Sequence, residues 1–264
     1  MDYSQILSQQ FNIKEEYAKN IITLLDDGNT IPFIARYRKE MHGSMDDQLI
    51  REFAEKLEYL RGLDKRRDEI RSLIDAQEKL TDEINLALDK AATLSELEDI
   101  YRPYRPKRKT RASIAKEKGL EPLANDILKQ EKGFEPSKSA VDYIDEEKGV
   151  TSVEDAIQGA MDIIAELVSD NAEIRKRIRN LTNANGVLVS VATDEEKDSV
   201  YKNYYDYKEP VKKIAGHRVL AVNRGEKEGF LKVSVETDSE KPLNSIFRAM
   251  ITDKNQLCSD IIRE

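Results

Sequence analysis

The sequence predicts a mainly α-helical fold with one small pair of β-strands. Charged residues make up 36% of the 264 residues and aromatic residues only 6%. This balance is typical of long helices that bury one stripe and leave the remaining surface in water. Apolar residues recur at helical spacing along most of the chain. Only the segments 186–193 and 230–236 are short, β-branched and framed by turn residues, so we expect them to pair as strands.

The first 45 residues contain signals for two helices. The first is predicted by apolar residues at i, i+4, i+7 and i+8, which are Tyr17, Ile21, Leu24 and Leu25. Gly28 follows, where a glycine favours the left-handed end of a helix. Pro32 then fits the first turn of a second helix, because its missing N–H has no intrahelical partner there.

A long helix is predicted from Ser44, its expected N-cap, to about residue 74. Its apolar face consists of Leu49, Phe53, Leu57, Leu60, Leu63, Ile70 and Ile74. The mixed charges at 64–68 are interpreted as a solvated face of this helix. Thr81 caps a short helix, and Thr93 with Glu96 has capping-box spacing ahead of another. Pro103 and Pro106 then end the helical pattern, because proline lacks an N–H and restricts the residue before it.

The second half of the chain predicts more helices and the strand pair. Helical spacing resumes near Leu120, continues at 137–148, and starts again after a second capping-box spacing at Thr151 and Glu154. Further helices are expected at 174–181, 243–251 and 255–262. Residues 217–226 fit a strand or a short helix equally well.

The expected domains are a helical domain at 1–182 and a small α+β segment at 183–264 that leads to a further domain. The chain ends inside a helical pattern. We therefore expect the natural protein to continue beyond residue 264.

Composition excludes several classes of protein. A single cysteine, Cys258, excludes an internal disulfide framework and fits a reducing compartment. The first ten residues lack the basic and apolar regions of a signal peptide. No apolar run approaches the roughly 18 residues that a membrane helix needs. We expect a soluble, cytoplasmic protein without a membrane partner.

The residues and motifs of catalysis are missing from the sequence. His42 and His217 lie far apart, and neither has a histidine or cysteine at ligand spacing, so a histidine–cysteine zinc site is excluded. Phosphate-binding loops of the GxxxxGK[ST] and GxGxxG types are absent, and so is the GxSxG nucleophile motif. The acids at 142–147 lack the pattern of an EF-hand. We expect no enzyme activity, no metal and no cofactor.

Residues 101–118 form a concentrated basic segment in a chain of net charge −8. The segment contains one acid, Glu117, and eight basic residues, which are Arg102, Arg105, Lys107, Arg108, Lys109, Arg111, Lys116 and Lys118. The charge of this segment is therefore +7. The other residues of the chain are acidic as a whole, so they repel a polyanion away from this segment.

Two interpretations of this segment remain open. In the first, the basic side chains bind nucleic-acid phosphates, which arginine grips with its planar fork, and Tyr101 and Tyr104 stack on bases. In the second, the tyrosines pack beneath the loop, and the arginines bind helix C-termini or acids of the same protein.

Four blocks of the sequence resemble the N-terminal region of the Tex family of bacterial transcription accessory proteins. They occur in the order of the family and span most of the chain: TIPFIARYRKE (30–40), EKLEYLRGLDKRRDEI (55–70), ATLSELEDIYRPYRPKRKTRASIAKEKGLEPLA (92–124) and HRVLAVNRGEKEG (217–229). The chain departs from the family at Arg102, where an apolar residue is usual, and at MHGSMDD (41–47).

The resemblance implies a helical scaffold with a helix-turn-helix element and an association with RNA and the transcription machinery. In the family, an RNase-H-like domain without nuclease activity, helix-hairpin-helix modules and an OB-fold RNA-binding domain follow. We expect a non-catalytic, RNA-binding transcription accessory protein that binds RNA or DNA without sequence preference. The alternative is a protein-interaction scaffold that docks onto RNA polymerase, the ribosome or another partner in transcription or translation.

Overall fold

The computed structural model describes residues 2–106, 108–252 and 254–264. The mainly α fold is confirmed, and the described strands form one small antiparallel sheet. Contacts group the chain into two units, residues 1–104 and residues 105–264. The boundary that the sequence places after residue 182 stays a prediction. The segment that follows it contains both the sheet and a last helix that packs in the core of the second unit.

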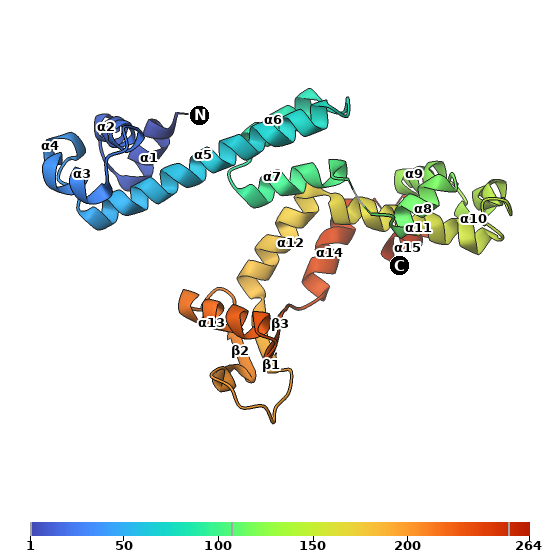
Figure 1. Cartoon of the computed structure of the whole chain (residues 1–264). Helices are drawn as coiled ribbons and strands as arrows, with labels where there is room; N and C mark the ends of the chain where they lie inside the picture. Colours follow the sequence, from blue (N-terminus) through green and yellow to red (C-terminus); the bar gives the residue numbers. More distant parts are fainter. Residues whose placement is uncertain (1, 107, 253) are drawn as a thin grey trace. The chain divides into compact units, whose positions relative to one another are not determined.

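The first unit is built along one long helix (Figure 1). Its helices are α1 (Tyr3–Phe11), α2 (Glu15–Asp26), α3 (Ile31–Tyr37), α4 (Lys39–His42), α5 (Asp47–Asp75), α6 (Asp82–Lys90) and α7 (Leu94–Tyr101), followed by a 3-10 turn at Arg102–Tyr104. The predicted long helix is therefore confirmed as α5, with 29 residues. Ser44 is not its N-cap, because the Asp46 carboxylate accepts the N–H of Leu49 at 2.8 Å. An aspartate two residues later caps the helix instead.

Helix α5 contributes to two separate apolar clusters. Its N-terminal half packs against α1–α4 through a cluster that contains Leu7, Ile21, Ile34, Ile50 and Phe53. Its C-terminal half packs against α6 and α7 through a second cluster that contains Leu63, Ile70, Ile74, Leu88 and Leu97. The predicted apolar face of the long helix is thus buried along its whole length.

The mixed charges on α5 are not simply a solvated face, as the sequence interpretation had them. Arg67 is only 5% exposed. Its guanidinium donates to the carbonyls of Leu88 at 2.8 Å and Ala91 at 2.9 Å, which lie at the C-terminal end of α6, where the Leu88 carbonyl also accepts the N–H of Ala91 at 3.3 Å. It also pairs with Asp64. A charged side chain is buried here because it satisfies the terminal carbonyls of a neighbouring helix.

The second unit contains the remaining helices and the sheet. In chain order they are α8 (Arg111–Glu117), α9 (Glu121–Lys129), α10 (Pro136–Ala140), a 3-10 turn at Val141–Tyr143, α11 (Val153–Asp170), α12 (Ala172–Asn185), β1 (Val187–Ala192), a 3-10 turn at Lys202–Tyr204, β2 (Asp206–Pro210), α13 (Gly216–Lys227), β3 (Leu231–Glu236), α14 (Glu240–Met250) and α15 (Gln256–Arg263). Helix α8 lies inside the basic segment, between Pro106, where the predicted helical pattern ends, and Leu120, where it resumes. The N-cap of α11 is Ser152, which accepts the N–H of Asp155, so the predicted capping pair is displaced by one residue.

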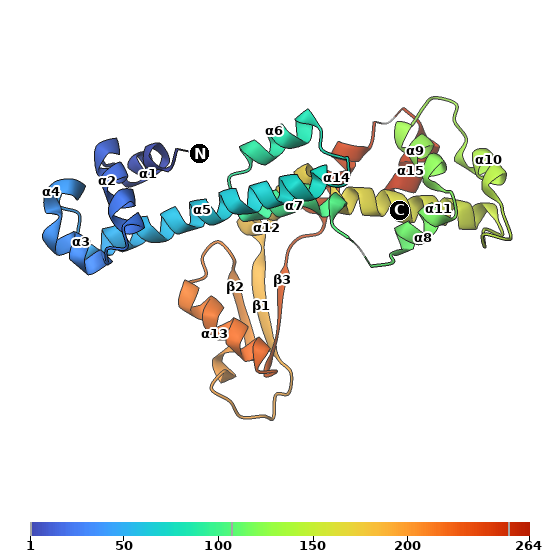
Figure 2. The same ribbon diagram turned by 45° about the horizontal axis from the view of Figure 1, so that its top comes forward.

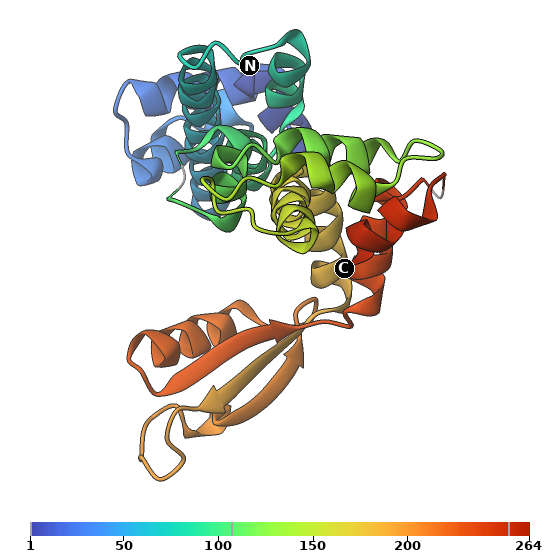
Figure 3. The same cartoon turned by 90° about the vertical axis from the view of Figure 1, so that its right-hand side faces the viewer.

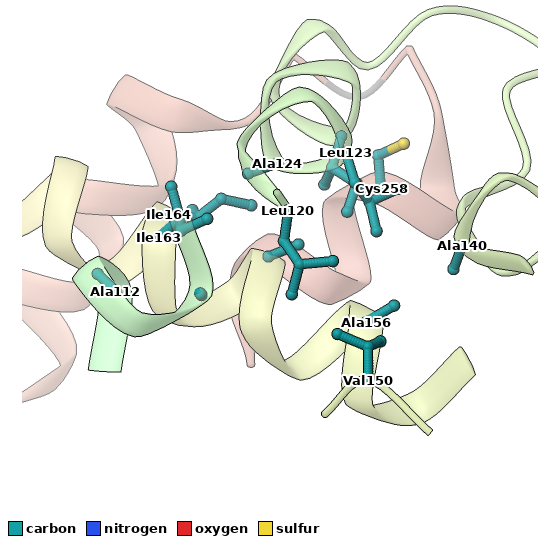
Figure 4. Close-up of a cluster of buried hydrophobic side chains, with 13 residues drawn as sticks. Ala112, Leu120, Leu123, Ala124, Ala140, Val150, Ala156, Ile163, Ile164 and Cys258 are labelled. Carbon is teal, nitrogen blue, oxygen red and sulfur yellow. The ribbon is translucent and has the colours of Figure 1, made fainter. Parts of the chain in front are cut away.

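The core of the second unit lies between α8, α9, α11 and α15 (Figure 4). Small residues let α8 approach α11 closely. A Cβ at Gly159 would lie 2.3 Å from Leu120 Cδ1 and 3.3 Å from the Cβ of Ala115. Since real side chains never approach so closely, this contact needs glycine, and it fixes where α8 stands on the unit.

The sheet has three antiparallel strands in the order β2–β1–β3 (Figure 2). The predicted pairing of the first and last strands is confirmed, with Ser190 opposite Val233. The sequence does not predict β2, whose residues DYKEP are charged and alternate between exposed and half-buried. An edge strand of this kind needs one apolar contact at most and tolerates its terminal proline.

Helix α13 covers one face of the sheet (Figure 3). Residues 217–226, whose sequence fits a strand or a short helix equally well, therefore form a helix. Gly225 lets it pack tightly, since a Cβ there would lie 2.5 Å from Leu231 Cδ1. At the other end of α13, Arg218 pairs with Glu209 of β2 at 2.9 Å. The hydrogen bond from Tyr207 has the largest effect on the pKa of Glu209 and lowers it, and the hydrogen bond from Arg218 lowers it further.

Candidate nucleic-acid interface

The boundary between the two units passes through the predicted basic segment. Tyr101, Arg102 and Tyr104 belong to the first unit, and Arg105 and all later members belong to the second. The predicted site residues therefore divide into two groups, each placed by its own unit. Lys107 lies outside the described residues.

The two tyrosines pack into the first unit. Tyr101 is 6% exposed in the cluster of α5, α6 and α7, and the guanidinium carbon of Arg66 lies 5.6 Å from the centre of its ring. Tyr104 is half-buried against the same cluster, and its carbonyl accepts a hydrogen bond from Gln77 at 2.9 Å. This matches the interpretation in which both rings pack beneath the loop, and the burial of Tyr101 leaves its ring no open face for a base. Arg102 is exposed.

The described cations ahead of α8 are exposed on the second unit. These are Arg105, Arg108 and Lys109. Thr110 then caps α8, because its hydroxyl accepts the N–H of Ser113 at 3.0 Å while the Ser113 hydroxyl accepts the N–H of Thr110. A firm cap next to the cations holds the start of α8 in place beside them.

Acids of the second unit engage several of the cations. Lys109 lies 3.1 Å from Glu117, with both side chains more than 60% exposed. Arg111 lies 3.7 Å from Asp162, and the Arg111 side chain is 85% exposed. The exposed Lys109–Glu117 pair contributes about 0–1 kcal/mol, so a phosphate can replace this carboxylate at little cost. The Asp162 side chain, by contrast, is only 18% exposed.

The last two cations are held more closely. Lys116 is half-buried and lies within 4 Å of both Glu121 and Glu166, at 3.6 and 3.9 Å. Lys118 donates to the carbonyl of Gly149 at 2.7 Å. These two lysines support the packing of α8, which agrees with the alternative interpretation of internal pairing for this part of the segment.

A second group of cations and aromatic rings lies on α3 and α4, and the sequence reasoning did not single it out. It consists of Phe33, Arg36, Tyr37, Arg38 and Lys39. The signal was present as three cations within residues 36–39 next to two aromatic residues. It was missed because its total charge is smaller than that of the segment 101–118.

Within residues 2–106, 108–252 and 254–264 no group of three or more His, Cys, Asp and Glu side chains could hold a metal ion. His42 is fully buried, with Nε2 3.1 Å from the carbonyl oxygen of Ile34. Crossing a membrane would need a longer apolar helix than any in the described part of the chain.

Two families match the chain in separate regions. The family described as Tex-like protein N-terminal domain matches residues 1–75, and the family described as Tex central region-like matches residues 131–262. The second match covers half of the chain. This chain belongs to the Tex family.

Relatives of this Tex-family chain extend from bacteria to humans. It is 42% identical over its whole length to "Uncharacterized protein YdcI" of Bacillus subtilis, of which it covers 38%. It is 38% identical to "Transcriptional accessory protein Tex" of Neisseria gonorrhoeae, over 89% of the chain and 31% of that protein. It is 31% identical to human "S1 RNA-binding domain-containing protein 1", over 89% of the chain and 24% of that protein. The chain thus spans well under half the length of these relatives.

Proposed function

We propose that this chain is a non-catalytic part of an RNA-binding transcription accessory protein, and that it contacts nucleic-acid phosphates through Arg108, Lys109 and Arg111 at the start of α8. Its relatives support the general role, because one is named a transcriptional accessory protein and another an S1 RNA-binding domain protein. RNA polymerase or the ribosome would be the protein partner. The helix-turn-helix element that the resemblance implies stays a prediction.

One observation carries the proposed contact. Arg108, Lys109 and Arg111 are exposed at the capped start of α8. Lys109 has only a weak, exposed pair with Glu117, and the exposed Arg111 side chain lies 3.7 Å from the half-buried Asp162. Three cations within four positions can bind successive phosphates of one strand. Because phosphates carry no sequence information, we expect little preference for sequence and binding to both RNA and DNA.

Charge reversal tests the proposal. The variant changes Arg108, Lys109 and Arg111 to glutamate, and the matched control changes Lys129, Lys132 and Lys138 to glutamate. Both variants alter the net charge of the second unit by the same amount, and the control lysines lie on or beside α9 and α10. Binding is measured as the anisotropy of a labelled oligouridine at low salt, with circular dichroism as the test of folding.

We expect the first variant to lose most of its affinity and the control to lose little, because only local phosphate contacts distinguish them. Equal loss in both variants would mean that net charge alone governs binding. If the first variant binds as the wild type does, the three cations at the start of α8 are not the contact.

A groove on the second unit favours the protein-interaction alternative. It has a volume of about 310 Å³ between α11, α12 and α14 and is lined by Val168, Ser169, Ile174, Arg175, Ile178, Arg179 and Ile246. An apolar groove with a basic rim suits an acidic amphipathic helix. Changing Ile178 to aspartate would abolish such an interaction with purified RNA polymerase and leave oligouridine binding unchanged.

A further inference from the structure

The outer surface of α3 and α4 combines one exposed and one half-buried aromatic ring with cations. Phe33, Arg36 and Tyr37 are spaced i, i+3 and i+4, so they lie on one face of α3. Tyr37 is 61% exposed, and its ring centre lies 5.3 Å from that of Phe33 at an interplanar angle of 45°. The guanidinium carbon of Arg38 lies 5.2 Å from the Phe33 ring centre on the same surface. The Tyr37 ring therefore has an open side next to a fixed ring and a fixed cation.

The charge of this surface suits an anion. The sequence has no acid between Gly28 and Lys39, and the nearest that follows is Glu40. Arg36 and Lys39 are exposed, and neither forms an ion pair within the described part of the chain. This distinguishes them from Lys109, Arg111 and Lys116, which have acid partners.

The surface is held rigidly from behind. His42 Nε2 lies 3.1 Å from the carbonyl oxygen of Ile34, which ties α4 to α3. Asn20 donates to the carbonyl of Met41 at 3.1 Å, which ties α4 to α2. Gly43 has a φ of +66° and packs on Tyr17, where a Cβ would lie 2.6 Å from the ring. A surface fixed in this way loses little entropy when it binds a ligand.

From these observations we infer that the α3–α4 surface binds a single-stranded polynucleotide, with a base stacked on Tyr37 and flanking phosphates held by Arg36 and Lys39. Nucleic acid fits better than a protein partner, because the surface offers one open ring between cations. A single strand is required, since bases in a duplex cannot reach a protein ring. The inference rests on the proposed function, that the chain binds nucleic acid, and adds a contact on the other unit.

Substitutions at Tyr37 test the stacking. We expect Tyr37→Ala to weaken the binding of a labelled oligouridine about tenfold, the usual effect of losing one base–aromatic stack. Tyr37→Trp should restore wild-type affinity, because tryptophan also offers a flat ring. Tyr59→Ala is the matched control. Tyr59 is 41% exposed and Lys56 Nζ lies 4.9 Å from its ring centre, yet Glu52 and Glu55 lie beside it.

A second arm tests the phosphate contacts. Changing Arg36 and Lys39 to glutamate should make the slope of log K against log salt less steep by about 1.4, which is 0.7 for each lost contact on a single strand. The stacking itself is followed with a 2-aminopurine oligonucleotide, whose fluorescence the Tyr37 ring should quench in the wild type and not in Tyr37→Ala.

The outcomes separate this inference from the proposed function. Wild-type binding by the Tyr37 and Arg36/Lys39 variants, together with lost binding in the charge-reversal variant at α8, would overturn the α3–α4 site alone. An equal loss in Tyr59→Ala would also overturn it, because any exposed tyrosine would then have the same effect. If the wild-type chain binds no oligonucleotide, the proposed function and this site fail together.

Discussion

Replacing Arg67 with methionine removes a buried guanidinium and keeps most of the aliphatic volume of the side chain. In the structure this guanidinium donates to the Leu88 and Ala91 carbonyls at the end of α6 and pairs with Asp64. The substitution removes the guanidinium donor from two carbonyls at the end of α6 and the charged partner from Asp64, which keeps its hydrogen bond from Tyr3. We therefore expect a large loss of stability from a position that the sequence presents as part of an ordinary charged helix.

The expected magnitude follows from those contacts. Each hydrogen bond from a charged donor contributes about 1.5–3 kcal/mol, and removing one partner of a buried ion pair costs about 3–5 kcal/mol. We expect the free energy of unfolding of the first unit to fall by about 3–5 kcal/mol. The control is Arg51→Met, whose ion pair with Asp47 is about half exposed on α5. Such a pair contributes about 0.3–0.5 kcal/mol.

Urea unfolding followed by far-UV circular dichroism measures both variants. With a denaturant slope of about 1–3 kcal/mol per molar, the midpoint for Arg67→Met should fall by at least about 1 M, and the midpoint for Arg51→Met should hardly change. If the two midpoints shift equally, the Arg67 contacts do not stabilise α6, and its burial has another cause.

Three further predictions concern glycines, pH and catalysis. Gly159→Ala should destabilise the second unit by about 1–3 kcal/mol, because the new Cβ would meet Leu120 Cδ1. Gly62→Ala should stabilise the first unit by about 0.5–1 kcal/mol, because a Cβ at this position of α5 meets no other atom and alanine favours the helix. Thermal unfolding measures both changes. The hydrogen bond from Arg61 holds the pKa of Asp26 below its ordinary value of 3.8, so the stability from this pair is present above that value and is lost as pH falls through the lowered pKa. Asp26→Asn should therefore flatten the acid dependence of unfolding, and an unchanged pH profile would contradict this. The purified chain should neither hydrolyse nucleotides nor cleave RNA. Either activity, if a single point substitution in the chain abolished it, would contradict this prediction.

Features that depend on neighbours along the chain could be predicted from the sequence. Gly28 has the expected positive φ at the end of α2, and Thr81 caps α6 through the N–H of Ile84. The apolar spacing of α5 gives both its length and its buried face. These signals depend only on residues close in sequence, so they can be recognised without knowledge of the tertiary fold.

Features that depend on tertiary partners could not be predicted. Strand β2 pairs only because β1 lies beside it, and its own residues are polar. Helix α8 forms where the sequence shows a break in the helical pattern, because Ala112 and Ala115 pack against α11. The same limit applies to the site. The sequence leaves open whether Tyr101 and Lys116 bind nucleic acid or pack internally, and burial and acid partners assign them to packing.

The salt dependence of single-strand binding tests the central claim most directly. The affinity of the wild-type chain for oligouridine is measured by anisotropy over a range of salt concentrations. If Arg108, Lys109 and Arg111 contact phosphates, the slope of log K against log salt should be about −2 or steeper in the wild type. In the triple glutamate variant the slope should be less steep by about 2. No binding at low salt, or equal slopes in the two proteins, would contradict the account.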